Sequence, residues 1–178
     1  QLIYLPPQPT NVLKERVHAF AEQVAARLAF EAGDPIEPLV VRLGGKLQYK
    51  NATGSEPPDS IVVEPTKKFR IFLSSMTSAE RDRFTIAHEL GHFFLHFPIV
   101  SRSSPEAGMK ATRWVDENDP VQRRAEWEAN WFAGAFLMSS SAFLLFFEKF
   151  EGDLARLALK FGVSGKAAEV RAKNLGLI

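Results

Sequence analysis

His88, Glu89 and His92 form the pattern H-E-x-x-H in the middle of a stretch that reads as a helix. Four residues make about one helical turn, so His88 and His92 are expected to project from the same face. Two imidazoles spaced in this way can bind one Zn²⁺ ion, and Glu89 beside them can take a proton from a water molecule at the metal. The alternative is a helix with two ordinary hydrogen-bonded histidines and a surface glutamate. The pattern alone does not distinguish this helix from a metal site, so other parts of the chain are needed to choose between them.

The helix that carries this pattern is expected to span residues 78–97. Thr77 and Glu80 match a capping box at its start, and Pro98 is expected to end it. Apolar residues are spread around its circumference, which is typical of a helix that is buried on most sides. Burying several polar side chains of such a helix is expensive unless they are paired or bound to a metal. This pattern therefore favours a metal site over two ordinary histidines.

A catalytic zinc site needs a third protein ligand and an open position. His96 follows His88 by eight residues, a rise of about 12 Å on a continuous helix, which is too far for both to bind one metal. His96 is instead expected to border the site, with a structural role or in contact with substrate. A second helix, expected over residues 121–138, offers Glu126 as the third ligand. Asn130 lies one turn beyond Glu126, where it can hydrogen-bond the outer nitrogen of a ligating histidine.

Glu128 is the alternative third ligand, two residues after Glu126. The two carboxylates lie about 200° apart around the helix, so they cannot both face one metal. Glu126 is preferred because Asn130 shares its face. Without a metal, both carboxylates would simply be solvated residues near a helix start, where negative charge suits the helix dipole.

Composition limits the classes of protein that the chain can represent. It has 178 residues, 46% of them apolar, which is enough for one compact domain over residues 1–178. A net charge of +1 gives no overall electrostatic signature of nucleic-acid binding. The chain has no cysteine, so any zinc ligands must be His, Asp or Glu, and a cytoplasmic location is expected. No apolar run reaches the roughly 18 residues of a membrane span, and residues 1–9 lack a signal-peptide pattern.

The predicted fold is α+β. Residues 1–10 read as a proline-containing extended arm, followed by a helix from residue 11. Strand-like runs at residues 46–50, 60–64 and 69–74 suggest a small three-stranded antiparallel sheet packed against a helical bundle that contains the H-E-x-x-H helix. Residues 51–59 are expected to form a mobile surface loop, and residues 99–120 are either functional or disordered. Residues 152–178 read as a C-terminal helical hairpin with a helix-turn-helix rhythm.

The chain resembles the ImmA/IrrE family of zinc metallopeptidases over about residues 46–178. The likeness is carried by residues 83–96, which read R-F-T-I-A-H-E-L-G-H-F-F-L-H, and residues 126–138, which read E-W-E-A-N-W-F-A-G-A-F-L-M. The tail from Phe161 to Leu177 is similar to the C-terminal helices of that family. Ser139 departs from the proline that the family often has at this position. The arm and the first helix contribute little to the resemblance.

The resemblance implies a zinc site formed by His88, His92 and Glu126, with Glu89 as general base. It also implies cleavage of a helix-turn-helix repressor or antitoxin, which would derepress stress-response or mobile-element genes. Mn²⁺ is an alternative metal, because availability as well as affinity decides occupancy. An oxyanion donor is expected, and the candidate substrate or oxyanion contacts, which the sequence does not rank, are His96, Tyr49 and Arg113.

Two rival functions belong to other classes. In the first, the chain is a DNA-binding regulator that uses its C-terminal hairpin, with Lys166, Arg171 and Lys173 facing phosphates and a relic metal site. Because the net charge is small, the preferred interpretation is that the hairpin packs on the rest of the chain and makes no direct contact with nucleic acid. In the second, the chain is a non-catalytic partner-binding module in which the metal is structural.

Overall fold

The computed structural model describes residues 1–50 and 58–178 of the chain, so most of the predicted surface loop at residues 51–59 lies outside the described residues. The strands are β1 (Tyr4–Leu5), β2 (Gly45–Tyr49), β3 (Asp59–Val63), β4 (Phe69–Leu73) and β5 (Gly108–Thr112). The helices are α1 (Lys14–Arg27), α2 (Glu37–Arg42), α3 (Ala79–Gly91), a π-helix (His92–His96), α4 (Phe97–Ser103), α5 (Pro120–Leu137), α6 (Ser140–Lys149), α7 (Leu154–Phe161) and α8 (Gly165–Asn174). The predicted α+β composition is confirmed.

The predicted three-stranded antiparallel sheet is wrong. The strands form a five-stranded mixed sheet in the order β1-β5-β3-β4-β2. β3 pairs antiparallel with both β4 and β5, whereas β2 runs parallel to β4 and β1 runs parallel to β5. Two of the strands come from segments that were not expected to be strands, namely the arm and residues 99–120.

The position of β2 at the edge of the sheet follows from how the two edges of β3 are filled. β3 and β4 are joined by a tight turn in which the amide of Lys67, at a φ of 74°, donates to the carbonyl of Glu64. The other edge of β3 is taken by β5, so β2 adds to the outer edge of β4. β3 and β4 are almost entirely buried, while β2 is largely exposed, as expected for an edge strand.

The helix that carries the H-E-x-x-H pattern differs from the prediction at both ends. Ser78, rather than Thr77, is the N-cap, and its side chain accepts a hydrogen bond from the amide of Arg81. Pro98 does not end the helical run, which continues as a π-helix and then as α4 up to Ser103. A proline interrupts the hydrogen-bond ladder of an α-helix, and a π-type turn just before it lets the chain continue.

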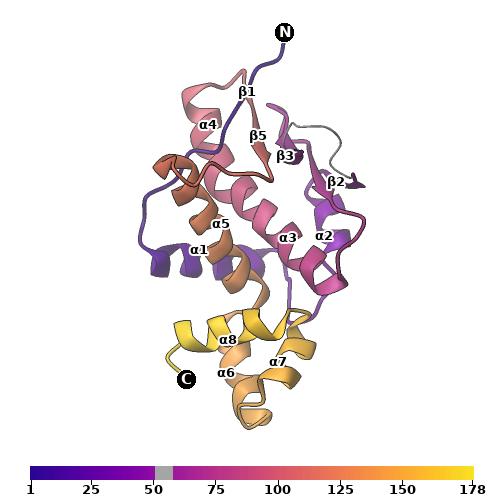
Figure 1. Ribbon diagram of the computed structural model, residues 1–178, viewed down its shortest axis with the longest axis vertical. Coiled ribbons are helices and arrows are strands. Elements are labelled where there is room, and N and C mark those ends of the chain that lie inside the picture. Colours follow the sequence, from indigo (N-terminus) through magenta and orange to yellow (C-terminus); the bar gives the residue numbers. More distant parts are fainter. Residues whose placement is uncertain (51–57) are drawn as a thin grey trace.

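Helices α3 and α5 form the centre of the molecule. Figure 1 shows α3 passing between the sheet and α5, and α5 also packs on α1. The two helices approach closely because small residues meet at their crossing: a Cβ added to Gly91 would lie 3.0 Å from the Cα of Ala129 and 3.1 Å from its carbonyl oxygen. This close crossing brings side chains from both helices within hydrogen-bonding distance of each other.

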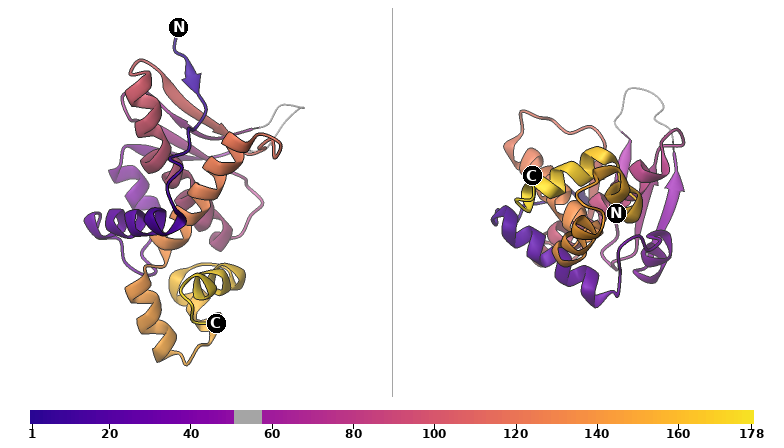
Figure 2. Two further views of the ribbon diagram at one scale, coloured as in Figure 1. Left: turned by 90° about the vertical axis from the view of Figure 1, so that its left-hand side faces the viewer. Right: turned by 90° about the horizontal axis from the view of Figure 1, so that it is seen from below.

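The C-terminal helices α6, α7 and α8 gather at one end of the molecule, opposite the N-terminus (Figures 1 and 2). The predicted helical hairpin is present as α7 and α8, with Asp153 and Ser164 as side-chain N-caps. Gly162 ends α7 in the left-handed conformation, with a φ of 68°. Among the described residues no single helix is long and apolar enough to cross a membrane, although α5 and α6, bent by 55°, meet that test as a pair on length and composition alone.

Gly91→Ala is expected to lower the free energy of unfolding by about 1–3 kcal/mol, because the added methyl group meets the backbone of α5 and the helices must separate. Gly134→Ala is the matched control, since no atom lies within 4 Å of a Cβ at that helical position. It should raise stability by roughly 0.5–1 kcal/mol through helix propensity alone. Urea unfolding of both variants measures the difference, and equal effects of the two would contradict the close packing.

Candidate metal centre

Three side chains, from α3, the π-helix that continues it and α5, converge where these helices cross. The Nε2 atom of His88 lies 3.2 Å from Oε1 of Glu126, and the Nε2 atom of His92 lies 2.6 Å from Oε2 of the same carboxylate. His88 and His92 are one helical turn apart, with their ring centroids 5.0 Å apart. The structure therefore brings together the three residues that were predicted as metal ligands.

Asn130 supports His88 from the same face of α5 as Glu126. Its Oδ1 lies 2.8 Å from Nδ1 of His88. An amide oxygen can only accept a hydrogen bond, so Nδ1 of His88 donates the proton and its Nε2 faces Glu126 without one when the ring is neutral. This is the orienting contact that was predicted for Asn130, and it leaves the inner nitrogen free to act as a ligand.

Glu89 lies beside the two histidines and lines an open cleft of about 370 Å³. The residue is only 3% exposed, and its Oε1 has no hydrogen-bond partner among the described residues. One ligand atom from each of His88, Glu89 and His92 lies within 4.8 Å of the others. Residues from β3, β4, α3, β5 and α5 line the cleft: Ser60, Leu73, Ser74, Thr77, Arg81, Asp82, Phe84, Thr85, His88, Glu89, Thr112, Arg113, Glu126 and Asn130.

Burial and neighbouring charges move the proton affinities of these groups apart. Burial raises the pKa of Glu89 to about 7, although the adjacent His88 opposes the shift. Burial alone would lower the pKa of His88, but the hydrogen bond to Glu126 and the charge of Glu89 outweigh it and raise it to about 9. Burial lowers the pKa of His92 to about 4. Burial would raise the pKa of Glu126, but the contacts of its carboxylate with the rings of His88 and His92 hold it well below its usual range.

The three candidate substrate or oxyanion contacts are separated by the structure. Arg113 lines the cleft and donates a hydrogen bond to the carbonyl oxygen of Phe72. Tyr49 is 61% exposed and is not part of the cleft lining. His96 is fully buried behind His92, with both ring nitrogens engaged, so a contact with substrate does not fit its position. Of the three, Arg113 is the one that lines the cleft.

Glu128 is directed away from the two candidate ligands His88 and His92. It is fully buried, and its carboxylate binds His96, Arg124 and the backbone of the arm. The helical geometry predicted that Glu126 and Glu128 face different ways, but the buried contacts of Glu128 were not anticipated. The sequence contained one signal of the contact between His92 and His96: the two residues are four apart, which places their rings on one helix face.

The donor set of the site fits a metal ion. The Nε2 atom of His92 is buried and has no hydrogen-bond partner of acceptable geometry within the described part of the chain, although a carboxylate oxygen lies next to it. A buried polar atom without a partner is costly, and a cation between Nε2 and the carboxylate would satisfy both. Two imidazole nitrogens and one carboxylate suit Zn²⁺. The H-E-x-x-H residues could therefore hold a metal ion, and the carboxylate of Glu126 from α5 lies beside both histidines.

Comparison with known proteins agrees with this class of site. The family described as the IrrE N-terminal-like domain, Peptidase_M78, matches residues 49–173, and the chain belongs to this family. Membership supports a metallopeptidase type of function. No curated protein gives a significant match. Among solved structures, a Mycobacterium tuberculosis transcriptional regulator is similar in fold, with a TM-score of 0.60 and 20% sequence identity. The match covers 89% of this chain and 46% of that one, so this chain spans about half the length of its structural relative.

Zinc affinity is expected to increase with pH between about pH 7 and 9, because the metal must displace a proton from His88, whose pKa in the metal-free protein is about 9. The metal-free state binds more protons than the metal-bound state, so raising the pH favours binding until His88 is deprotonated. At about pH 8, titration calorimetry in buffers of different ionisation enthalpy should show about one proton released per zinc. An affinity that does not change over this range would contradict the protonated state of His88.

Proposed function

We propose that this chain is a zinc-dependent peptidase that hydrolyses a peptide bond held in the cleft above His88 and His92. The observation that carries the proposal is the convergence of these two histidines and Glu126 beside a buried, unpartnered Glu89 in an open cleft. A structural zinc site would have all its positions closed by protein ligands. Two of the three candidate ligands, His88 and Glu126, line an open cleft, which instead supports a catalytic role. Mn²⁺ is the alternative metal.

Bound zinc would act as a Lewis acid, polarising the scissile carbonyl group and lowering the pKa of water at the site. Glu89 is the general base in this proposal. With its pKa raised to about 7 by burial, its carboxylate can take a proton from water and return it to the leaving amine near neutral pH. Asn130 holds His88 in the required orientation. Arg113, on the wall of the cleft, is the candidate donor to the developing oxyanion.

For the substrate, we propose a helix-turn-helix repressor or antitoxin, cleaved at one site, in a cytoplasmic pathway that derepresses stress-response or mobile-element genes. This part of the proposal depends on the family to which the chain belongs. The size of the cleft, about 370 Å³, agrees with a short extended segment as the bound species. A linker or loop of a repressor would fit such a cleft, whereas a folded helix pair would not.

Direct DNA binding is the alternative, and the name of the structural neighbour favours it. The basic side chains of the C-terminal hairpin give little support to DNA binding. Arg171 is 2% exposed, donates to the carbonyl oxygen of Met138 and lies 3.6 Å from Glu22. Lys166 and Lys173 both lie against Glu169. These contacts support a hairpin that packs on the rest of the chain. Salt-dependent binding of a DNA duplex by the purified protein would favour the alternative.

Glu89→Gln is expected to retain zinc and to lose about 10²–10⁴-fold in the rate of cleavage, because the amide has the shape of the carboxylate but cannot accept a proton. The measurement incubates zinc-loaded protein with the purified helix-turn-helix repressor encoded beside it and follows the new chain ends by mass spectrometry. Glu80→Gln, an exposed residue at the start of the same helix, is the matched control and should cleave at the rate of the unmodified protein.

Undiminished cleavage by Glu89→Gln would exclude Glu89 as the general base. Zinc-dependent hydrolysis of a generic unfolded protein without cleavage of any repressor would retain the peptidase and reject the proposed substrate class. Failure of the zinc-loaded protein to cleave either one would reject the proposed function.

A further inference from the structure

A row of buried polar side chains continues from the candidate metal centre away from the cleft. The Nδ1 atom of His92 lies 2.8 Å from Nδ1 of His96, and Nε2 of His96 lies 2.9 Å from Oε1 of Glu128. All three side chains are essentially excluded from solvent. None of the catalytic steps above uses His96 or Glu128, so these buried groups need a separate explanation.

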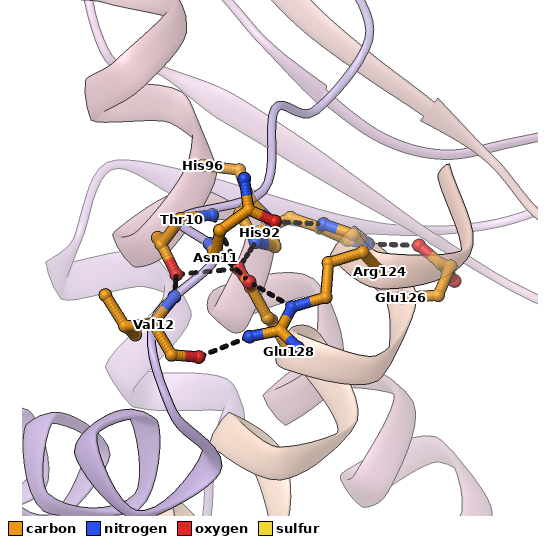
Figure 3. Close-up of polar contacts among 8 residues, drawn as sticks. All are labelled: Thr10, Asn11, Val12, His92, His96, Arg124, Glu126 and Glu128. Atoms are coloured by element: carbon orange, nitrogen blue, oxygen red, sulfur yellow. Dashed lines mark hydrogen bonds and ion pairs between the residues drawn. The ribbon is translucent and has the colours of Figure 1, made fainter. Parts of the chain in front are cut away.

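The N-terminal arm encloses the far end of this row. Figure 3 shows the carboxylate of Glu128 facing the arm, with Thr10 and Asn11 on one side and Arg124 on another. Oε1 accepts from the backbone amide of Thr10 at 2.8 Å and from its hydroxyl group at 2.9 Å. Oε2 accepts from the amide of Asn11 at 2.8 Å and from Nε of Arg124 at 2.9 Å. Arg124 also donates to the carbonyl oxygen of Val12.

The backbone of the arm is bent to make these contacts. Asn11 adopts a φ of 60°, a left-handed conformation that few residues other than glycine and asparagine tolerate. This bend directs two consecutive amide groups at one carboxylate, an arrangement that suits an anion. Both oxygens of the Glu128 carboxylate are surrounded by donors, namely two backbone amides, a hydroxyl group and the permanently charged guanidinium group of Arg124. In this surrounding the carboxylate acts only as an acceptor.

The carboxylate of Glu128, at the far end of the row, fixes the direction of each hydrogen bond. Because this carboxylate can only accept, Nε2 of His96 donates to it. In a neutral imidazole the other nitrogen of His96, Nδ1, then carries a lone pair. It can accept a hydrogen bond from the N–H group at Nδ1 of His92. His92 is left with a lone pair on Nε2, the atom that lies beside Glu126. A metal ligand needs this tautomer, since a protonated Nε2 cannot bind a cation.

We propose that Glu128 and His96 form a positioning relay that holds His92 with its proton on Nδ1 and its Nε2 free for the metal, and that Thr10 and Asn11 of the arm complete the relay. This inference rests on the proposed role of His92 as a metal ligand. Asn130 orients His88 directly, whereas His92 is oriented through a second histidine. The arm lies outside residues 49–173 that match the family, so part of the support comes from a segment beyond the matched region.

The test measures the tautomer of His92 in the zinc-free protein and the affinity for zinc alone. At about pH 8, ¹⁵N–¹H correlations of the imidazole rings distinguish the two tautomers, and competition with a chromophoric chelator gives the zinc dissociation constant. His96→Phe removes the acceptor of His92 while keeping a ring of similar size. We expect it to put a proton on Nε2 in part of the molecules and to weaken zinc binding by about 10–100-fold.

Thr10→Val tests the contribution of the arm by a small change at a half-buried site, and it remains informative if His96→Phe does not fold. It removes the hydroxyl donor to Glu128, and we expect a several-fold loss of zinc affinity with a partial change of the His92 tautomer. Thr10→Ser restores the hydroxyl group and should reverse both effects. Thr66→Val, at an exposed turn position between β3 and β4, is the matched control for the chemical change.

A zinc-free protein whose His92 carries its proton on Nε2 would overturn the relay, as would a His96→Phe variant with unchanged zinc affinity. Unchanged affinity and tautomer in Thr10→Val would overturn the role of the arm. A purely structural role would lower thermal stability without changing the tautomer, and that result also rejects the relay. Neither the tautomer nor the zinc affinity depends on proteolysis. If both change as expected in a protein that cleaves nothing, the relay is retained and the proposed function is rejected.

Discussion

The close crossing of α3 and α5 is the constraint on which the rest of the structure depends. A carboxylate of one helix can meet two imidazoles of the other only where the backbones are nearly in contact, and Gly91 packed on Ala129 provides that approach. The sheet and α1 support this pair of helices, because β4 contacts α3 and α1 packs against α5. The cleft forms where the ends of three strands leave one side of the crossing open.

Electrostatics explains why the buried groups around this crossing are tolerated. An isolated charge in such a place would cost several kcal/mol, and two of the three carboxylates here, Glu126 and Glu128, have polar partners at both oxygens instead. Glu126 faces two imidazoles, and Glu128 faces two backbone amides, a hydroxyl group, a guanidinium group and an imidazole. Glu89 is the exception, with an oxygen that has no partner among the described residues and a pKa raised to about 7. The least satisfied of the buried acids is the one nearest the proposed chemistry.

The features that sequence reasoning predicted correctly are those set by local helical geometry. Glu126 and Asn130 share a face because they are one turn apart, and that face meets His88. The sheet was predicted wrongly because strand order depends on which edges are free after the whole chain has folded. β2 pairs in parallel with β4 at the edge of the sheet, not with the next strand in sequence, β3, whose two edges are taken by β4 and β5, and no local pattern in residues 45–49 indicates this. His96 was expected to border the site, with a structural role or in contact with substrate, and the structure places it between His92 and Glu128, a partner that the sequence did not indicate.

The bent arm at Thr10 and Asn11 has a thermodynamic consequence. Coupling between two events is reciprocal, so a segment that strengthens cation binding must itself be held more firmly, by the same factor, once the cation is bound. The arm is attached at two points, through the pairing of β1 with β5 and through the carboxylate of Glu128. Metal occupancy would then be communicated to the edge of the sheet more than a hundred residues away in the chain from Glu128. A cell that changed the supply of the cation would, through this linkage, change how readily the arm detaches from Glu128 and β5.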